Sequence, residues 1–310
     1  MKNWLPAAIA ATAAAGTILL LLPLPAMSQE QPPAGQAPGA AAPGAGGRGG
    51  RGGGFGRGGG RGPALPPPGP VKHTADGHPD LSGYYNAGNN GGAVFSVEKH
   101  ASRGAGFGAG NGAIVDPPDG MIPYLPEAAA RAKDNWDHHL ADEPELHCYQ
   151  SGVPSQLYRQ FGFEILQPAG YIVMNWEFMH AVRIIPTDNR PHVLPASTHL
   201  FMGDSVGHWE GDTLVVDTTN LNDRTWLDGA GNVHSDQLHV VERFTAKDDR
   251  TINYEATLED PKVYSRPWKI AFPLNKNMQP NYEIMEFACI EGNDDTQHYT
   301  EATGGKAKTK

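Results

Sequence analysis

The runs Leu238-His-Val-Val-Glu-Arg-Phe244 and Thr251-Ile-Asn-Tyr-Glu-Ala-Thr-Leu258, joined through Lys247-Asp-Asp-Arg250, decide the fold class. In both runs apolar and polar residues alternate, and β-branched and aromatic residues are frequent. Both features are typical of strands that bury one face. The short polar connection between the two runs predicts an antiparallel hairpin.

Further runs of this kind extend the pattern over most of the chain. We expect strands at residues 171–178, 180–185, 213–218, 263–272 and 282–290, and a first edge strand within residues 80–85. No helical pattern separates these runs, so the sequence predicts a mainly β fold, an antiparallel barrel or sandwich with long irregular loops. One helix is expected over 126–140, on the N-terminal side of most strands, because Pro126 can open it and apolar residues recur on one face.

The N-terminal segment, residues 1–28, is predicted to be a signal peptide. Lys2 precedes an apolar run from Ala7 to Leu22, and Ala26-Met27-Ser28 fits a small-x-small cleavage site. We therefore expect a periplasmic or extracellular protein that has no membrane insertion after cleavage. An uncleaved anchor is the alternative.

Residues 29–72 are predicted to form a disordered tether that is rich in Gly, Arg and Pro. Residues 29–70 contain 16 Gly and 9 Pro, a composition that cannot bury enough apolar area to order the chain. Its arginines could make a weak contact with an anionic cell surface. A single mainly β domain is expected over 73–303, followed by a disordered tail at 304–310.

The charge of the chain is divided unevenly between these parts. Residues 73–310 carry a formal charge of −15, although the whole chain carries −10. A domain with this charge repels nucleic acid and anionic lipid at long range, so neither is an expected partner.

The block Gly207-His-Trp-Glu-Gly-Asp-Thr-Leu-Val-Val-Asp-Thr218 is the most distinctive motif. Together with Asp80-Leu-Ser-Gly83, Glu242-Arg-Phe244, Glu259-Asp-Pro261 and Glu286-Phe-Ala-Cys289, it resembles a functionally uncharacterised family of secreted bacterial proteins. The resemblance implies a shared fold over about residues 79–293 and carries over no activity. At the level of the fold, strands separated by Gly-Asp turns are similar to calycin or lipocalin-type barrels.

Two carboxylates, Glu242 and Glu286, fall on the apolar faces of predicted strands. An ionised carboxylate inside a protein needs a cation, a hydrogen-bond network or a wet cavity. They could line a cavity and bind or protonate a polar ligand, with Glu177 and Arg183 nearby. The alternative is a buried ion pair, with Arg183 or Arg243, that only fixes strand register.

Several histidines and loop residues are further candidates. His234 and His239 could act in acid-base chemistry, while Trp226 and Asp228 could contact a ring-containing ligand. Asp134, His138 and Asp142 share one helix face, but no established zinc spacing is present, so no metal site is assigned and no cofactor is identified.

Cys148 and Cys289 are the only cysteines. In an exported chain an even cysteine count predicts a disulfide. A metal pair formed by Cys148 with the adjacent His147 is the alternative.

These observations leave three functional hypotheses. The first is a secreted barrel that binds a small apolar or ring-containing ligand in a cavity with inward carboxylates. The second is an extracytoplasmic lyase, isomerase or hydrolase with a Glu/His acid-base pair such as Glu242 with His234 or His239, with or without the help of a metal. The third is a cell-envelope structural or interaction protein, which would have a filled barrel and an apolar surface patch.

Overall fold

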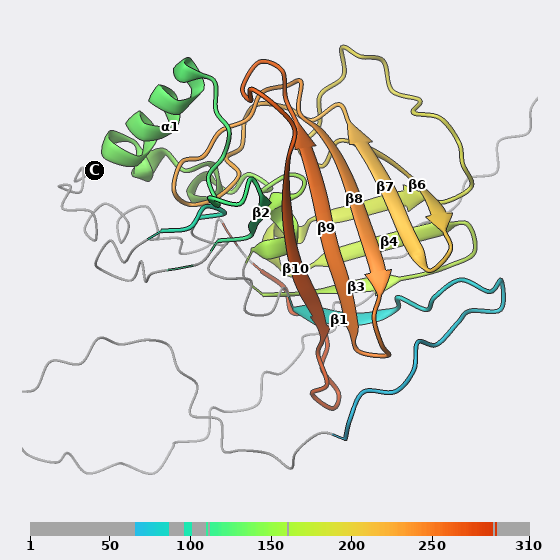
Figure 1. The fold of residues 1–310 in the computed structure, drawn as a ribbon. Coiled ribbons are helices and arrows are strands. Elements are labelled where there is room, and N and C mark those ends of the chain that lie inside the picture. Colours follow the sequence, from blue (N-terminus) through green and yellow to red (C-terminus); the bar gives the residue numbers. More distant parts are fainter. Residues whose placement is uncertain are drawn as a thin grey trace, which may run out of the picture. The chain divides into compact units, whose positions relative to one another are not determined.

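Ten antiparallel strands form one sheet that curls into a nearly closed barrel, as a computed structural model of the chain shows (Figure 1). The strands are β1 (Gly83–Asn86), β2 (Ile114–Asp116), β3 (Gly162–Leu166), β4 (Tyr171–Trp176), β5 (Val182–Pro186), β6 (Asp204–Glu210), β7 (Thr213–Thr219), β8 (His239–Ala246), β9 (Thr251–Glu259) and β10 (Trp268–Lys276). Their order is β5-β4-β3-β1-β10-β9-β8-β7-β6, and β2 pairs with β10. The mainly β, barrel-like prediction is therefore confirmed.

The structure describes residues 66–86, 96–100, 110, 112–159, 161–287 and 289. The predicted signal peptide, residues 29–65 of the predicted tether and the predicted tail at 304–310 lie outside the described residues. Residues 66–72 were expected to belong to the tether, but they contact the turn between β8 and β9. Gly69 N–H donates to Asp249 Oδ1 at 2.7 Å, and Arg250 Nη1 donates to the carbonyl of Pro66 at 2.7 Å.

The strands β6 to β10 are neighbours in sequence order and form one wall of the barrel, with short turns at β6–β7 and β8–β9 and a long connection between Thr219 and His239 (Figure 1). At the β6–β7 turn Gly211 has φ +56°, the left-handed conformation that a two-residue hairpin loop requires. Along β8 the alternation places Val240, Glu242 and Phe244 inside the barrel.

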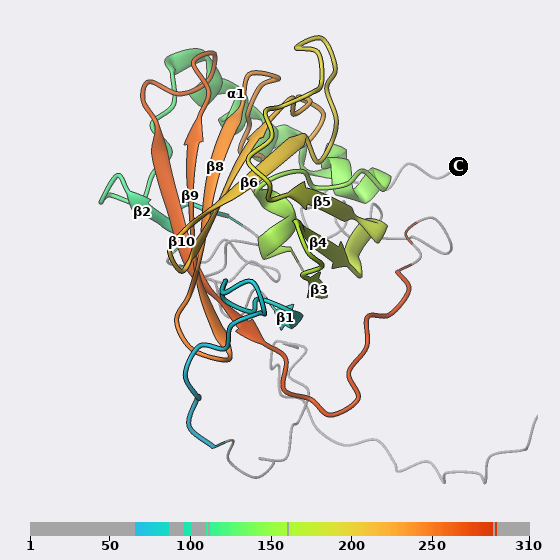
Figure 2. The same ribbon diagram turned by 90° about the vertical axis from the view of Figure 1, so that its right-hand side faces the viewer.

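The shorter strands β3, β4 and β5 form the opposite wall, with β1 between them and β10 (Figure 2). The expectation that the first strand lies at an edge is wrong, because β1 pairs with both β3 and β10. The sequence analysis did not identify β2, β3 or β6. Strand β3 is short, and β6 carries Ser205 and Gly207 at inward positions where an apolar residue was expected.

The predicted strand at 282–290 is wrong. Residues 282–287 run as irregular chain, held by Glu177, whose Oε1 accepts bonds from Tyr282 Oη at 2.8 Å and from Met285 N–H at 3.0 Å. The strand expected over 263–272 instead begins at Trp268 and extends to Lys276. The apolar pattern before Trp268 comes from Val263 and Tyr264, which are buried in a turn rather than in a strand.

The single α-helix of the described part of the chain, α1 (Pro126–His138), lies beyond one end of the barrel (Figure 1). Pro126 stands in its first turn, and Ala128 and Ala132 are its buried residues. Short 3-10 turns follow at Leu140–Asp142, Pro144–His147, Ser155–Tyr158 and Phe178–His180. No helix in the described residues is long and apolar enough to cross a membrane.

Large side chains fill the inside of the barrel. Trp268, Tyr85, Tyr254, Phe163 and Phe244 are all almost fully buried. Tyr254 packs against Phe244 and Phe272, with ring centroids 5.1 and 4.9 Å apart. The wide, water-filled interior that would have housed inward carboxylates is therefore not observed, because aromatic rings occupy it.

Cys148 and Cys289 form a disulfide that joins the turn after α1 to the chain beyond β10. The predicted disulfide is confirmed, and the Cys148–His147 metal alternative is wrong because the thiol is oxidised.

Candidate functional site

The two end strands of the sheet, β5 and β6, meet at a seam where the barrel stays open. Near Gly207 of β6 the seam is tight, since a Cβ there would lie 3.1 Å from Ile185 and 3.3 Å from Thr187. Only glycine lets the two strands approach this closely without displacing a neighbour. At the other end of β5, segment 200–205 and residues 193–194 cover the gap, and a pocket lies between them and the strand.

Arg183 of β5 reaches across the seam into the barrel. Its Nε donates to Ser205 Oγ of β6 at 3.0 Å, and its Nη2 donates to Thr218 Oγ1 of β7 at 2.7 Å. The same Nη2 forms an ion pair with Glu242 of β8. Tyr254 of β9 completes the network by donating its hydroxyl to Glu242 Oε1 at 2.9 Å. One side chain thus connects the last strand of one wall to three strands of the other, and Glu242 extends the network to a fourth.

This network is almost entirely removed from water. The side chain of Arg183 is 3% exposed and that of Glu242 is 0% exposed. Burial, followed by the nearby Glu242 charge, holds the pKa of Tyr254 well above its ordinary value, so its hydroxyl stays a hydrogen-bond donor. Glu242 is therefore a paired carboxylate, which is the ion-pair alternative rather than a group free to protonate a ligand.

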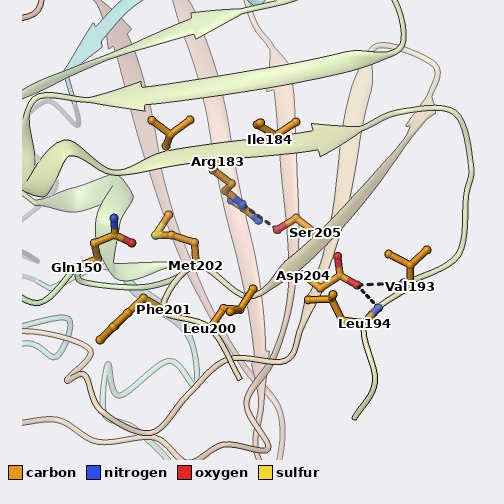
Figure 3. A pocket seen from close by; sticks show the side chains of 12 residues that line it. Gln150, Arg183, Ile184, Val193, Leu194, Leu200, Phe201, Met202, Asp204 and Ser205 are labelled. Carbon is orange, nitrogen blue, oxygen red and sulfur yellow. Dashed lines mark hydrogen bonds between the residues drawn. The ribbon is translucent and has the colours of Figure 1, made fainter. Parts of the chain in front are cut away.

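The seam pocket has a volume of about 440 Å³, within the range of sites that hold small molecules. Most of its lining is apolar, and two of the lining residues, Ile184 and Val193, are 60% and 74% exposed. The residues that line it are Gln150, Val182, Arg183, Ile184, Val193, Leu194, Leu200, Phe201, Met202, Gly203, Asp204 and Ser205. Figure 3 shows Arg183 and Ile184 projecting to opposite sides of β5, with Arg183 directed toward Ser205.

Two charged side chains face this apolar space. Arg183 Nη1 donates to no group in the described part of the chain, and Arg183 is one of the lining residues. Asp204 stands on the other side, where its Oδ2 accepts the N–H groups of Val193 at 3.2 Å and Leu194 at 3.5 Å (Figure 3) and contacts His192 Nδ1 at 3.2 Å. The pocket therefore offers one guanidinium, one carboxylate and the polar side chains of Gln150 and Ser205 in a lining that is otherwise apolar.

The structure separates most of the residues that the sequence analysis proposed as one site. Glu286 is exposed on irregular chain, so its expected inward position is wrong, because the strand that would have placed it there does not form. Glu177 is buried and holds the C-terminal segment. Of the proposed set, only Glu242 and Arg183 are brought into contact.

Asp228 and Trp226 are both surrounded by other parts of the protein. Asp228 is fully buried and accepts bonds from the N–H groups of Val97, Ala230 and Asn232 and from the Asn232 amide. It orders its own loop instead of facing a cavity. Trp226 is partly buried and packs against the core.

Neither histidine pairs with Glu242. His239 lies on the outer face of β8, and Glu242 on the inner face, so the predicted Glu242–His239 pair is wrong. His239 Nε2 instead contacts both oxygens of Asp217 at 3.1 Å, which raises the pKa of the imidazole. His234 is buried against Thr225 Oγ1 at 2.9 Å, and its burial lowers its pKa.

The acidic and histidine side chains of α1 pair on an exposed surface. His138 Nδ1 contacts Asp134 Oδ1 at 2.8 Å, and His139 Nδ1 contacts Asp142 Oδ2 at 2.9 Å. Within the described ranges, no three His, Cys, Asp or Glu residues have an arrangement that could hold a metal ion.

A second buried charge cluster lies in the 3-10 turns that follow α1. Arg159 Nε is 2.5 Å from Glu145 and its Nη1 is 3.8 Å from Glu143. Burial, followed by repulsion from Glu145, raises the pKa of Glu143 to about 8. One guanidinium compensates only one carboxylate, so the more distant Glu143 retains a proton near neutral pH.

The sequence analysis missed the pocket-lining segment 200–205 and the hydroxyl partners of Arg183. Ser205, Thr218 and Tyr254 all carry the inward parity of their strands, and that parity could have identified them. The pocket itself had no signal in the sequence, because it depends on two strands that are distant in the sheet order.

No protein-family model, curated protein or solved structure matches this chain. The resemblance to the secreted bacterial family therefore stays a prediction.

Proposed function

We propose that the protein binds a small, largely apolar ligand in the seam pocket between β5 and segment 200–205. The observation that carries this proposal is the pocket of about 440 Å³, whose mainly apolar lining includes an arginine whose Nη1 donates to no group among the described residues. Apolar pockets with a few placed polar groups are the usual form of small-molecule sites. The proposed ligand lies at the seam rather than beside inward carboxylates, because the barrel interior is filled.

The exposed rim supports the same proposal. Val193 and Leu200 line the pocket and are 74% and 43% exposed, although each could have been polar at no cost to the core. Burial of these side chains against an apolar ligand removes their surface from water, at about 25 cal/mol per Å².

A matched pair of substitutions tests the proposal with the neutral fluorophore N-phenyl-1-naphthylamine. Leu200→Glu places a charge in the pocket lining, whereas Leu166→Glu makes the same change on β3, outside the pocket. The two leucines have similar exposed fractions, 43% and 46%. We expect Leu200→Glu to weaken fluorophore binding at least about tenfold, and Leu166→Glu to change it less than about twofold.

Equal effects of the two variants, or an absence of binding by the parent protein, would contradict the proposal. Thermal unfolding of both variants checks that the charge has not altered the fold.

The filled barrel and the apolar rim also agree with a second candidate function, an interaction protein. The N–H of Trp176 donates to Ala181 C=O, so the alternation of an antiparallel ladder directs the backbone groups of Val182 and Ile184 away from β4, toward the open seam. Strong self-association of the parent protein that Val182→Glu abolishes, without fluorophore binding, would favour this second function.

A further inference from the structure

The charges around the pocket restrict which polar group a ligand can carry. Arg183 lines the pocket, and its positive charge is already balanced by Glu242, which is fully buried. Asp204, whose Oδ2 contacts His192 Nδ1 at 3.2 Å, adds a second carboxylate at the lining. The guanidinium that lines the pocket therefore belongs to an ion pair and is not an unpaired cation.

An anionic head group would encounter these two carboxylates. To bind Arg183 it would have to share one guanidinium with Glu242 in a region of low dielectric, leaving one negative charge uncompensated. A cationic head group would face the positively charged Arg183 at the same point. An uncharged oxygen accepts the N–H bonds of Arg183 without either penalty.

We propose that the natural ligand carries an uncharged hydrogen-bond acceptor, such as a hydroxyl or a carbonyl, against Arg183 Nη1. The rest of the ligand is an apolar chain or ring system that contacts Leu194, Leu200 and Met202 and extends to the exposed Val193. This inference rests on the proposed function of the pocket and adds the chemical class of the ligand.

Three amphiphiles with the same chain and different head groups test the ligand class. Decan-1-ol, decanoate and decylammonium are each used to displace N-phenyl-1-naphthylamine from the full chain near neutral pH. We expect decan-1-ol to bind at least about tenfold more tightly than either ion. Tighter binding of decanoate or of decylammonium than of decan-1-ol would overturn the inference. Failure of the fluorophore and of all three amphiphiles to bind would instead overturn the proposed function.

A substitution of the lining carboxylate supplies a second test. Asp204→Asn removes a negative charge, and its amide oxygen can still accept the N–H groups of Val193 and Leu194. We expect the ratio of decanoate to decan-1-ol affinity to rise about three- to tenfold. Glu210→Gln removes a charge from the same strand, outside the pocket lining, and is expected to leave this ratio within about twofold of that of the parent. An equal rise in both variants, or no rise in Asp204→Asn, would contradict the charge argument.

Discussion

At the scale of single residues, burial of the Glu242 carboxylate costs desolvation free energy, and the ion pair with Arg183 offsets that cost. Both groups are withdrawn from water, and their hydrogen-bond partners Ser205, Thr218 and Tyr254 replace the lost hydration. A pair of this kind adds little net stability against apolar residues of the same shape, but losing one partner is costly. The network therefore specifies how β5 meets the other wall of the barrel.

Replacement of Glu242 by Gln tests this role. The amide keeps the shape but leaves the charge of Arg183 buried without a counterion, so we expect a loss of about 3 to 5 kcal/mol in the free energy of unfolding. Urea denaturation measures it. Glu255→Gln is the control, because Glu255 pairs with Lys269 on the exposed face of the next strand, and its loss should cost at most about 1 kcal/mol. Similar losses in the two variants would contradict the buried-pair interpretation.

Glu143 predicts an unusual dependence of stability on pH. Its pKa is about 8 in the folded protein, above the ordinary value of 4.5, because it is buried beside Glu145. A carboxyl with a raised folded pKa stabilises the folded state fully below the unfolded pKa, and this contribution is lost as pH rises toward 8. Glu143→Gln cannot ionise, so we expect it to flatten the decline in stability between about pH 5 and pH 8.

Urea midpoints of parent and variant at several pH values in this range measure that difference. Each pKa unit corresponds to about 1.4 kcal/mol, so the effect should be at least on the order of 1 kcal/mol. Parallel pH profiles for the two proteins would show that Glu143 does not hold a proton in the folded state.

At the scale of strands and helices, period-2 alternation was a reliable guide to the central strands of the larger wall. It located β7, β8 and β9 closely and placed Glu242 on the inner face. It failed at residues 282–290, where the same alternation belongs to irregular chain held by Glu177. Alternation alone does not show whether a neighbouring strand is present to accept the backbone bonds, and that is a property of the whole sheet.

The candidate site could be predicted only in part for the same reason. Sequence parity brought Glu242 inside and named Arg183 as a possible partner, and their contact is now observed. Parity also places His239 on the opposite face of β8 from Glu242, a conflict that the sequence analysis left unresolved. The pocket requires that β5 and β6, opposite ends of the sheet, come together, and no local pattern encodes that closure.

The close contact at Gly207 gives a prediction for the seam. Gly207→Val would push against Ile185 and Thr187, so we expect a loss of about 1 to 3 kcal/mol from overpacking. Amide hydrogen exchange should be faster in β5 and β6 than in the parent, while β8 and β9 should change little. Unchanged exchange at β5 would mean that the two strands can move apart at Gly207 without a cost in free energy.

At the scale of the whole molecule, the disulfide between Cys148 and Cys289 links chain segments that are 141 residues apart. A cross-link over a loop of this length stabilises chiefly by restricting the unfolded chain, typically by about 2 to 5 kcal/mol. We expect the double change Cys148→Ser with Cys289→Ser to lower the free energy of unfolding by that amount while the barrel still forms.

Unfolding of the double variant and of the parent, followed with and without a reductant, measures this contribution. The double variant should show no response to the reductant, and the reduced parent should approach its stability. A reductant that leaves the parent unchanged would contradict the prediction.

The position of β1 between β3 and β10 affects how the protein must be made. A ribosome delivers β1 before the other strands, and its partner Lys276 follows about 190 residues later. Until β10 emerges, one side of β1 has no strand to pair with, so vectorial growth of the chain cannot complete the barrel step by step. Nascent chains halted before Trp268 would thus expose unpaired backbone to chaperones and proteases, and the emergence of β10 becomes the event that commits this protein to its native topology.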